Sequence, residues 1–542
     1  MKNFWRGGEL FVWMTASGVA ISLLMVGSML SLIMVNGLGQ FWPATLHEIR
    51  LKTQEIVIGE VVGQEVIPNS STPDKPKGLA RYRYRVGNRD VFSSEYRWIN
   101  GEDIVSTSSP NDLTFVERRQ WGPAFGRLSI VAVDGTTENM DSHTSAAIEA
   151  LVAESTNLRQ RIEHVERDEI GAINYRMEKA RLERQALMLD GQLSPREVQE
   201  DRRLVDYIAT LEQEYQAQTV TLEQLHKEAG KKTLLLTLSN GKTARLTLEQ
   251  IIAVSMPNDM SWIHKLNAYL HNLWLFVSSE PREANTEGGI FPAIFGTVLM
   301  VFLMTIAVMP FGVMAAVYLR EYAKQGVLVR LVRIAVNNLA GVPSIVFGVF
   351  GLAFFVYALG GTIDQWLFPE SLPNPTFGTG GILWASLTLA LLTVPVVIVA
   401  TEEGLSAVPR DFREGSVGLG ATKFETIWHV ILPCALPGIL TGLILAMARA
   451  AGEVAPLMLT GVVKLAPSLP LDSYVPFLHL DRKFMHLGFH IYDVGFQSPN
   501  VEAAKPMVYM TTLILILVVV LLNWAAVMLR NRLRKRFAMS AV

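Results

Sequence analysis

Long apolar stretches with few or no charged residues alternate with polar segments along the chain. A helix crosses a bilayer with about 20 mainly apolar residues, and six stretches are long enough. They cover residues 10–46, 288–319, 334–363, 371–401, 433–463 and 506–529. The fourth opens with a Pro- and Gly-rich segment, so we expect its helix to begin near Gly380. The pattern predicts an α-helical membrane protein with six transmembrane helices.

Basic residues outside these stretches predict the orientation, because Lys and Arg are enriched in cytoplasmic loops. Lys2 and Arg6 precede the first stretch, and a basic cluster follows the sixth. Basic residues also separate the second stretch from the third and the fourth from the fifth, whereas residues 364–370 contain none. We therefore expect both termini to be cytoplasmic. The first apolar run is longer than the roughly 7–15 residues of a signal-peptide core, which predicts a retained N-terminal transmembrane helix over residues 1–46.

Residues 47–285 form a polar block between the first two stretches, which the orientation places outside the membrane. Its first part alternates Arg81, Arg83 and Arg85 with apolar or aromatic residues, a period of two that predicts strands. The arginine row could bind anions, but it is more typical of the solvent side of a half-buried sheet. Over about residues 145–229, apolar residues recur at spacings of three and four, which predicts an antiparallel, coiled-coil-like helical hairpin with arms of roughly 50–65 Å. Asn240-Gly241 then predicts a β-hairpin with a type I′ turn.

Composition excludes several classes of protein. Only 18% of the residues are charged, against about 25% in typical globular chains, and the net charge of −2 gives no basic field for nucleic acid. One cysteine, Cys434, excludes a disulfide framework or a cysteine-based metal site within the chain. Gly241-Lys242-Thr243 resembles the end of a phosphate-binding loop, but Leu236 stands where that loop needs glycine. We find no catalytic constellation and expect no metal and no cofactor.

The most specific segment covers residues 402–433, between the fourth and fifth stretches. A short helix from about Arg410 to Leu419 is expected, with Gly420 able to stop it in a left-handed conformation and Thr422 able to cap the next helix. Pro433 and Pro437 would mark the entry into the fifth span. The segment is suited to docking a partner, although an ordinary connector would also fit.

This segment resembles the EAA loop of ABC-importer permeases, which has the pattern E-A-A-x-x-x-G, nine residues, then I-x-L-P. The matching positions are Glu414, Gly420, Val430, Leu432 and Pro433, while Gly415 and Ser416 replace the two alanines. In that family the loop sits in a cleft of a separate cytosolic ATPase and transmits its closure. The resemblance therefore implies ATPase coupling through Glu414, Gly415, Ser416, Gly420 and Ala421. We call residues 402–433 the EAA-like loop.

Three further segments, residues 288–297, 338–348 and 448–457, resemble the permease of the phosphate-specific ABC transporter, the PstA type. The resemblance covers about residues 287–530, so it implies an ABC permease transmembrane domain over 286–542 and assigns no function to the external insert. It implies a bacterial cytoplasmic (inner) membrane location and inorganic phosphate as substrate. The implied partners are a second homologous permease, two ATPase subunits, an extracytoplasmic phosphate-binding protein and membrane lipid, with no nucleic acid.

Arg449 and Glu453 are the chemically notable residues of the fifth stretch. Charges inside a span are costly and usually face the bundle interior, and residues at i and i+4 pair on one helix face. Arg449 could offer two donors to a passing phosphate, with Glu453 holding it in place, or the pair could be a structural salt bridge. Asn338, Gly341, Pro343 and Ser344 in the third stretch are candidates for pore lining or gating.

Other functions fit less well. A permease for another oxyanion, sulfate or molybdate, is the main alternative. A membrane receptor with an external sensor domain would need a cytoplasmic output domain, but the longest internal segment has only about thirty residues. A membrane-bound enzyme would need a catalytic constellation. We therefore expect a transporter permease subunit in which a partner hydrolyses ATP.

Overall fold

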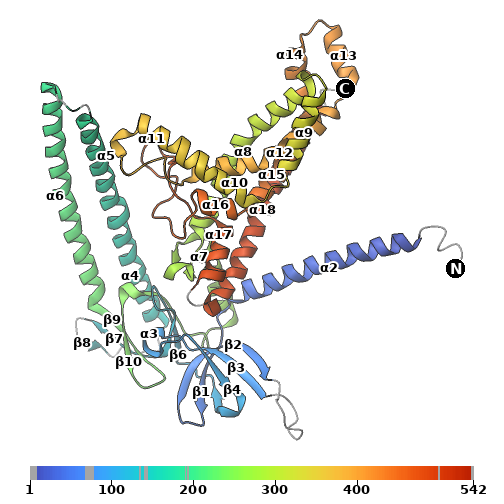
Figure 1. Ribbon diagram of the computed structural model, residues 1–542. Helices are drawn as coiled ribbons and strands as arrows, with labels where there is room; N and C mark the ends of the chain where they lie inside the picture. Colours follow the sequence, from blue (N-terminus) through green and yellow to red (C-terminus); the bar gives the residue numbers. More distant parts are fainter. Residues whose placement is uncertain are drawn as a thin grey trace. The chain divides into compact units, whose positions relative to one another are not determined.

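The computed structural model describes residues 9–67, 79–133, 136–138, 145–189, 191, 194–498 and 501–538. Lys2 and Arg6, on which part of the predicted orientation depends, lie outside these residues. The chain divides into two compact units (Figure 1). The first, helical unit comprises residues 1–40, 276–368 and 372–542, and the second comprises residues 41–275 and 369–371.

Six helices in the described residues are long and apolar enough to cross a membrane. They run over Phe11–Gly39, Phe291–Tyr322, Ser344–Leu367, Ile382–Ser406, Lys423–Gly452 and Ala504–Leu533. These stretches belong to α2 (Glu9–Gly39), α8 (Phe291–Val317) with the π-helical turn η5 (Tyr318–Tyr322), α10 (Ser344–Phe350) with η6 (Gly351–Gly360) and α11 (Gly361–Leu367), α12 (Ile382–Ser406), α14 (Lys423–Glu425) with η8 (Thr426–Ile431) and α15 (Leu432–Gly452), and α18 (Val501–Ala538). The predicted fold class, a six-span helical membrane protein, is confirmed.

The third span differs from its predicted bounds. The apolar stretch 334–363 is divided between α9 (Val327–Leu339) and α10, with a break over residues 340–343. Pro343 has no N–H and disfavours helical backbone at the preceding residue, so a new helix starts directly after it. Asn338 therefore lies at the end of α9 rather than inside the spanning helix.

The fifth span also differs. Its helix starts at Lys423, ten residues before Pro433, because Thr422 and Glu425 form a capping box. Pro433 and Pro437 lie within this helix rather than at its start. The helix ends at Gly452, and Glu453 is extended, with φ −81° and ψ 131°. A separate helix, α16 (Ala455–Thr460), follows.

Small residues bring α12 and α15 into close contact. A Cβ atom added to Gly438 would lie 2.7 Å from Gly404 Cα, and one added to Gly442 would lie 2.4 Å from Ala400 Cβ. Each helix thus presents two small residues four apart, an arrangement that lets the backbones of membrane helices approach closely. The two helices on either side of the EAA-like loop are held together in this way.

The second unit contains two antiparallel sheets. The first has the strand order β4-β3-β2-β1-β5, with β1 (Leu46–Leu51), β2 (Ile56–Ile67), β3 (Leu79–Arg85), β4 (Tyr96–Asn100) and β5 (Ile104–Ser108). The second has the order β10-β9-β7-β6-β11, with β8 beside β7. Its strands are β6 (Leu113–Arg118), β7 (Ala124–Val133), β8 (Thr136–Glu138), β9 (Lys232–Thr237), β10 (Thr243–Thr247) and β11 (Ile251–Ser255). Further elements are α3 (Arg89–Phe92), α7 (Trp262–Ser278), β12 (Pro281–Arg282), β13 (Glu287–Gly288) and α17 (Leu487–Tyr492).

The arginine row of β3 lies on a partly exposed face with partners of its own. Arg81 and Arg83 lie over the Trp98 ring of β4, at 4.6 and 5.6 Å from its centroid. Arg85 Nε is 2.7 Å from a Glu95 carboxylate oxygen. These contacts agree with the interpretation of the row as the outer face of a half-buried sheet.

The predicted helical hairpin is present. One arm comprises α4 (Ser145–Glu163), the π-helical segment η2 (His164–Glu169) and α5 (Ile170–Met188), and the other is α6 (Pro195–Lys231). Apolar side chains of both arms pack together, including Ile162 with Leu225 and Ile173 with Leu211. The hydroxyl of Ser155 in α4 donates to the carbonyls of Leu248 and Ile251, so α4 is attached to the second sheet.

Two local predictions in this unit are wrong. Gly241 has a positive φ but Asn240 does not, so the hairpin turn is not type I′. The amide of Leu238 bonds the carbonyl of Lys242, which makes a three-residue loop with glycine in the left-handed position. Gly87-Asn88 in the sequence also predicts a turn into a strand over Val91–Ile99, but the strand begins only at Tyr96, because Asn88 leads into the one-turn helix α3.

Candidate functional site

The EAA-like loop contains a short exposed helix between two fixed ends. Helix α13 (Arg410–Gly418) follows Pro409 and has no buried residue. Two residues beyond its end lies Gly420, whose φ is +87°. The amide of Gly420 bonds the carbonyl of Val417, and that of Ala421 bonds the carbonyl of Ser416, which is the Schellman arrangement of a helix end. The predicted helix and its glycine stop are therefore present.

The predicted coupling residues have different surroundings. Glu414 and Gly415 are exposed on α13, and Ala421 is half-buried after the glycine stop. The Ser416 hydroxyl lies 2.9 Å from the Thr426 hydroxyl of the fifth span, so Ser416 fastens α13 rather than facing outward. Glu402 and Glu403, which open the predicted loop, still belong to α12.

Exposed apolar side chains surround this helix end. Leu419 is 91% exposed, and Val417, Phe424 and Trp428 are also exposed. The rings of Phe424 and Trp428 stack with centroids 6.1 Å apart. This aromatic pair was not predicted, although its spacing of four at the start of a helix was a usable signal.

Arg449 and Glu453 form the predicted ion contact, with Arg449 Nε 3.5 Å from Glu453 Oε1. Their position differs from the prediction. Arg449 lies in the last turn of α15, and Glu453 lies beyond the helix end, because the helix stops at Gly452. The two side chains are 35% and 22% exposed. The pair therefore lies at a helix break rather than on one face of a continuous helix.

The candidates of the third stretch lie at a second helix break. Gly341 and Pro343 are exposed between α9 and α10, Asn338 is exposed on the last turn of α9, and Ser344 starts α10. A Cβ atom added to Gly348 would lie 2.7 Å from Pro456 Cα, and one added to Gly351 would lie 3.0 Å from Thr460 Cγ2. The residue numbers increase in the same order on both sides of these contacts, from Gly348 to Gly351 and from Pro456 to Thr460. The helices α10 and α16 therefore run in the same direction. The breaks before Ser344 and before Ala455 therefore lie at the same end of this helix pair.

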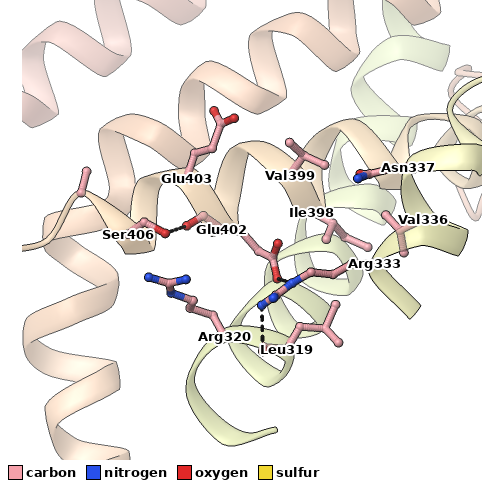
Figure 2. A pocket seen from close by; sticks show the side chains of 11 residues that line it. Leu319, Arg320, Arg333, Val336, Asn337, Ile398, Val399, Glu402, Glu403 and Ser406 are labelled. Atoms are coloured by element: carbon pink, nitrogen blue, oxygen red, sulfur yellow. Dashed lines mark hydrogen bonds and ion pairs between the residues drawn. The ribbon is translucent and has the colours of Figure 1, made fainter. Parts of the chain in front are cut away.

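A pocket of about 620 Å³ is lined by residues of η5, α9 and the last turns of α12 (Figure 2). Arg333 Nε lies 3.1 Å from Glu402 Oε1, and Arg333 Nη2 donates to the Leu319 carbonyl. Figure 2 shows Arg320 on the other side of the pocket, and Glu403 pointing away from Glu402. In the sequence these arginines indicated only the orientation, and the pocket was not predicted. Among the residues that the structure describes, no group of three or more His, Cys, Asp or Glu side chains is placed to hold a metal ion.

Comparisons with known proteins place the helical unit in a family. Residues 308–535 match the binding-protein-dependent transport system inner membrane component. This region contains the EAA-like loop, both helix breaks and the pocket, and it excludes residues 47–285. The family consists of transporter permease subunits rather than enzymes, and these work with ATPase and substrate-binding protein partners.

Individual relatives agree with this match. The probable ABC transporter permease YqgI of Bacillus subtilis is 31% identical over 42% of this chain and 74% of its own length. The phosphate transport permease PstA 1 of Mycobacterium tuberculosis is 35% identical over 45% of this chain and 71% of its own. PstA of Yersinia pestis is 35% identical over 35% of this chain and 59% of its own. The chain is therefore a multi-pass inner-membrane subunit and belongs to the binding-protein-dependent ABC-importer permeases of the PstA type.

Proposed function

We propose that this permease carries inorganic phosphate and that Arg449 contacts the anion on its way. The observation that carries the proposal is the Arg449–Glu453 pair at the end of α15, in a chain whose relatives include permeases named for phosphate transport. Among the described residues, Arg449 has no polar partner besides Glu453, so donor atoms of its planar fork remain for an oxyanion.

The surrounding backbone supports this site. Broken helices in transporters place free helix ends at the substrate, and both breaks here lie at one end of the α10–α16 pair. Ser344 opens a helix that continues to Leu367, and a helix N-terminus favours anions. Glu453 balances the charge of Arg449 in the empty site, which would keep the anion from being held permanently.

The remaining parts of the proposal concern coupling and topology. The EAA-like loop docks a separate ATPase through α13 and the exposed side chains around Gly420. The loop and both termini are cytoplasmic, and residues 47–285 are extracytoplasmic. A second homologous permease completes the pore, two ATPase subunits supply the energy, and an extracytoplasmic phosphate-binding protein delivers the substrate.

Uptake of labelled phosphate by the reconstituted transporter tests the substrate. Unlabelled phosphate should compete with the label, whereas sulfate and molybdate in excess should not. Competition by sulfate or molybdate at similar concentrations would favour the other oxyanion instead.

Variants of Arg449 test the contact. Lysine keeps the charge but loses the planar fork, so Arg449→Lys should impair uptake and Arg449→Ala should abolish it, with complex yield unchanged in both. A purely structural pair predicts lost yield in Arg449→Ala and recovery in Arg449→Ala/Glu453→Gln, because the unpaired carboxylate is then removed. Restored uptake in that double variant would exclude the phosphate contact.

A further inference from the structure

Two basic residues of the EAA-like loop, Arg413 and Lys423, contact one turn of the second span. Residues Tyr318–Tyr322 continue α8 as the π-helical turn η5. From α13, Arg413 Nη1 lies 3.0 Å from Glu321 Oε1. From the start of the fifth span, Lys423 Nζ donates to the Glu321 carbonyl and lies 5.0 Å from the centroid of the Tyr322 ring. Glu321 is thus held by one cation through its side chain and by another through its backbone.

The contact between Arg413 and Glu321 is well shielded on the acidic side. The Glu321 side chain is only 9% exposed. Arg413 also donates through Nη2 to the Leu405 carbonyl, at 2.7 Å, in the last turn of α12, where carbonyls lack an intrahelical partner. One arginine side chain therefore joins α13 to the ends of two spans. Removing one member of a buried pair leaves an uncompensated charge, so each half of the contact depends on the other.

Helix α13 is otherwise weakly anchored. It has no buried residue, and its second polar link is that between Ser416 and Thr426. The helices beneath it are held by an apolar cluster that includes Leu405 of α12 and Ile427 and Ile431 of the fifth span. The ends of α12 and the fifth span are therefore held by apolar packing, whereas α13 is attached to them by polar contacts. Arg413 provides the contact between α13 and the second span.

We infer that Glu321 is a positioning residue for energy coupling: through Arg413 it passes the movement of α13 to the second span. The inference rests on the proposed function of the EAA-like loop as the ATPase docking site. Loss of a coupling contact lowers the amount of substrate moved for each ATP hydrolysed. Loss of a merely structural salt bridge would lower substrate transport and ATP hydrolysis together.

The test uses the complete transporter in proteoliposomes with labelled phosphate and its binding protein. Phosphate taken up and ATP hydrolysed are measured together in Glu321→Gln, Arg413→Gln and the exchange Glu321→Arg/Arg413→Glu. Lys324→Gln is the matched control, because Lys324 is an exposed cation three residues beyond Glu321 with no polar contact among the described residues. ATPase co-purification is recorded for every variant.

We expect the ATPase subunit to co-purify with both single variants. The ratio of phosphate taken up to ATP hydrolysed should fall about fivefold or more, the usual range of coupling between sites. The exchange should raise this ratio above either single variant, and Lys324→Gln should leave it unchanged. An unchanged ratio, a proportional fall of both activities, or lost complex yield that the exchange does not restore would each overturn the role of Glu321. If the ATPase does not co-purify with the unaltered chain, docking itself fails and the inference fails with it.

Discussion

Replacing Gly420 by valine should weaken the docking of the ATPase that we propose for the EAA-like loop. The backbone of Gly420 has φ +87°, and no atom lies within 4 Å of an added Cβ, so the penalty comes from the backbone alone. A left-handed conformation costs a non-glycine residue roughly 1–2 kcal/mol, and a β-branched side chain stands at the upper end of that range. One or two kcal/mol changes an equilibrium by roughly 5–30-fold. We therefore expect ATPase co-purification and phosphate uptake to fall within that range in Gly420→Val.

Matched glycine variants separate this effect from simple crowding. Asparagine tolerates the left-handed region better than alanine, so uptake should decrease in the order Gly420, Gly420→Asn, Gly420→Ala, Gly420→Val. Gly418 is the last residue of α13, also with open space around its Cβ position, and alanine stabilises a helix relative to glycine. Gly418→Ala should therefore retain full activity. Normal co-purification and uptake in Gly420→Val would refute the assignment of the loop as the docking site.

Three further predictions concern packing, the insert and pH. Gly438→Ala should lower the thermal stability of the purified chain in detergent by about 1–3 kcal/mol, because the new Cβ lies 2.7 Å from the Gly404 backbone; Gly361→Ala, with open space, should not. Deleting residues 170–219 and joining the arms by a short linker removes the outer hairpin but keeps Ser155 on the sheet. Reduced uptake at low phosphate would assign the hairpin a part in transport, and normal uptake at all phosphate levels would exclude one. Burial lowers the pKa of His486 to about 3 and that of His490 to about 4. The unfolded chain therefore takes up these protons first, and each histidine should cost about 1.4 kcal/mol per pH unit as the pH falls below 6.5. Asparagine can accept the hydrogen bond that the Gly488 amide now donates to His486. His486→Asn should therefore reduce the loss of thermal stability between pH 6.5 and 5. An unchanged pH profile would contradict the lowered pKa of His486.

Hydropathy was sufficient to find all six spans, because apolar length is what a bilayer selects. Helix breaks inside apolar stretches were not found, because hydropathy does not distinguish a helix from the turn that interrupts it. Gly341 and Pro343 gave the only signal for the break in the third span. For the fifth span, the Thr422–Glu425 capping box extended the helix by ten residues, a local hydrogen-bond effect that outweighed the two prolines.

The site was predictable where it depends on local backbone and not where it depends on tertiary contacts. Gly420 was identified from its place after a short helix, and its φ of +87° agrees. Arg449 and Glu453 were identified as a pair, but Gly452 ends the helix between them. Glu321, held by Arg413 and Lys423 from distant parts of the chain, had no signal in the sequence, because its role depends on three helices meeting.

In the proposed mechanism, the two functional regions lie at opposite ends of one helix. The fifth span runs without interruption from Lys423, next to the docking helix, to Gly452, next to Arg449. At 1.5 Å per residue, its 30 residues extend about 45 Å. Its small-residue contacts hold it against α12, so movement of the EAA-like loop would be passed to both helices. The helix ends at the extended backbone of Glu453, close to Arg449, which we propose contacts the anion. The helix break therefore lies where a change in the loop would alter the substrate contact.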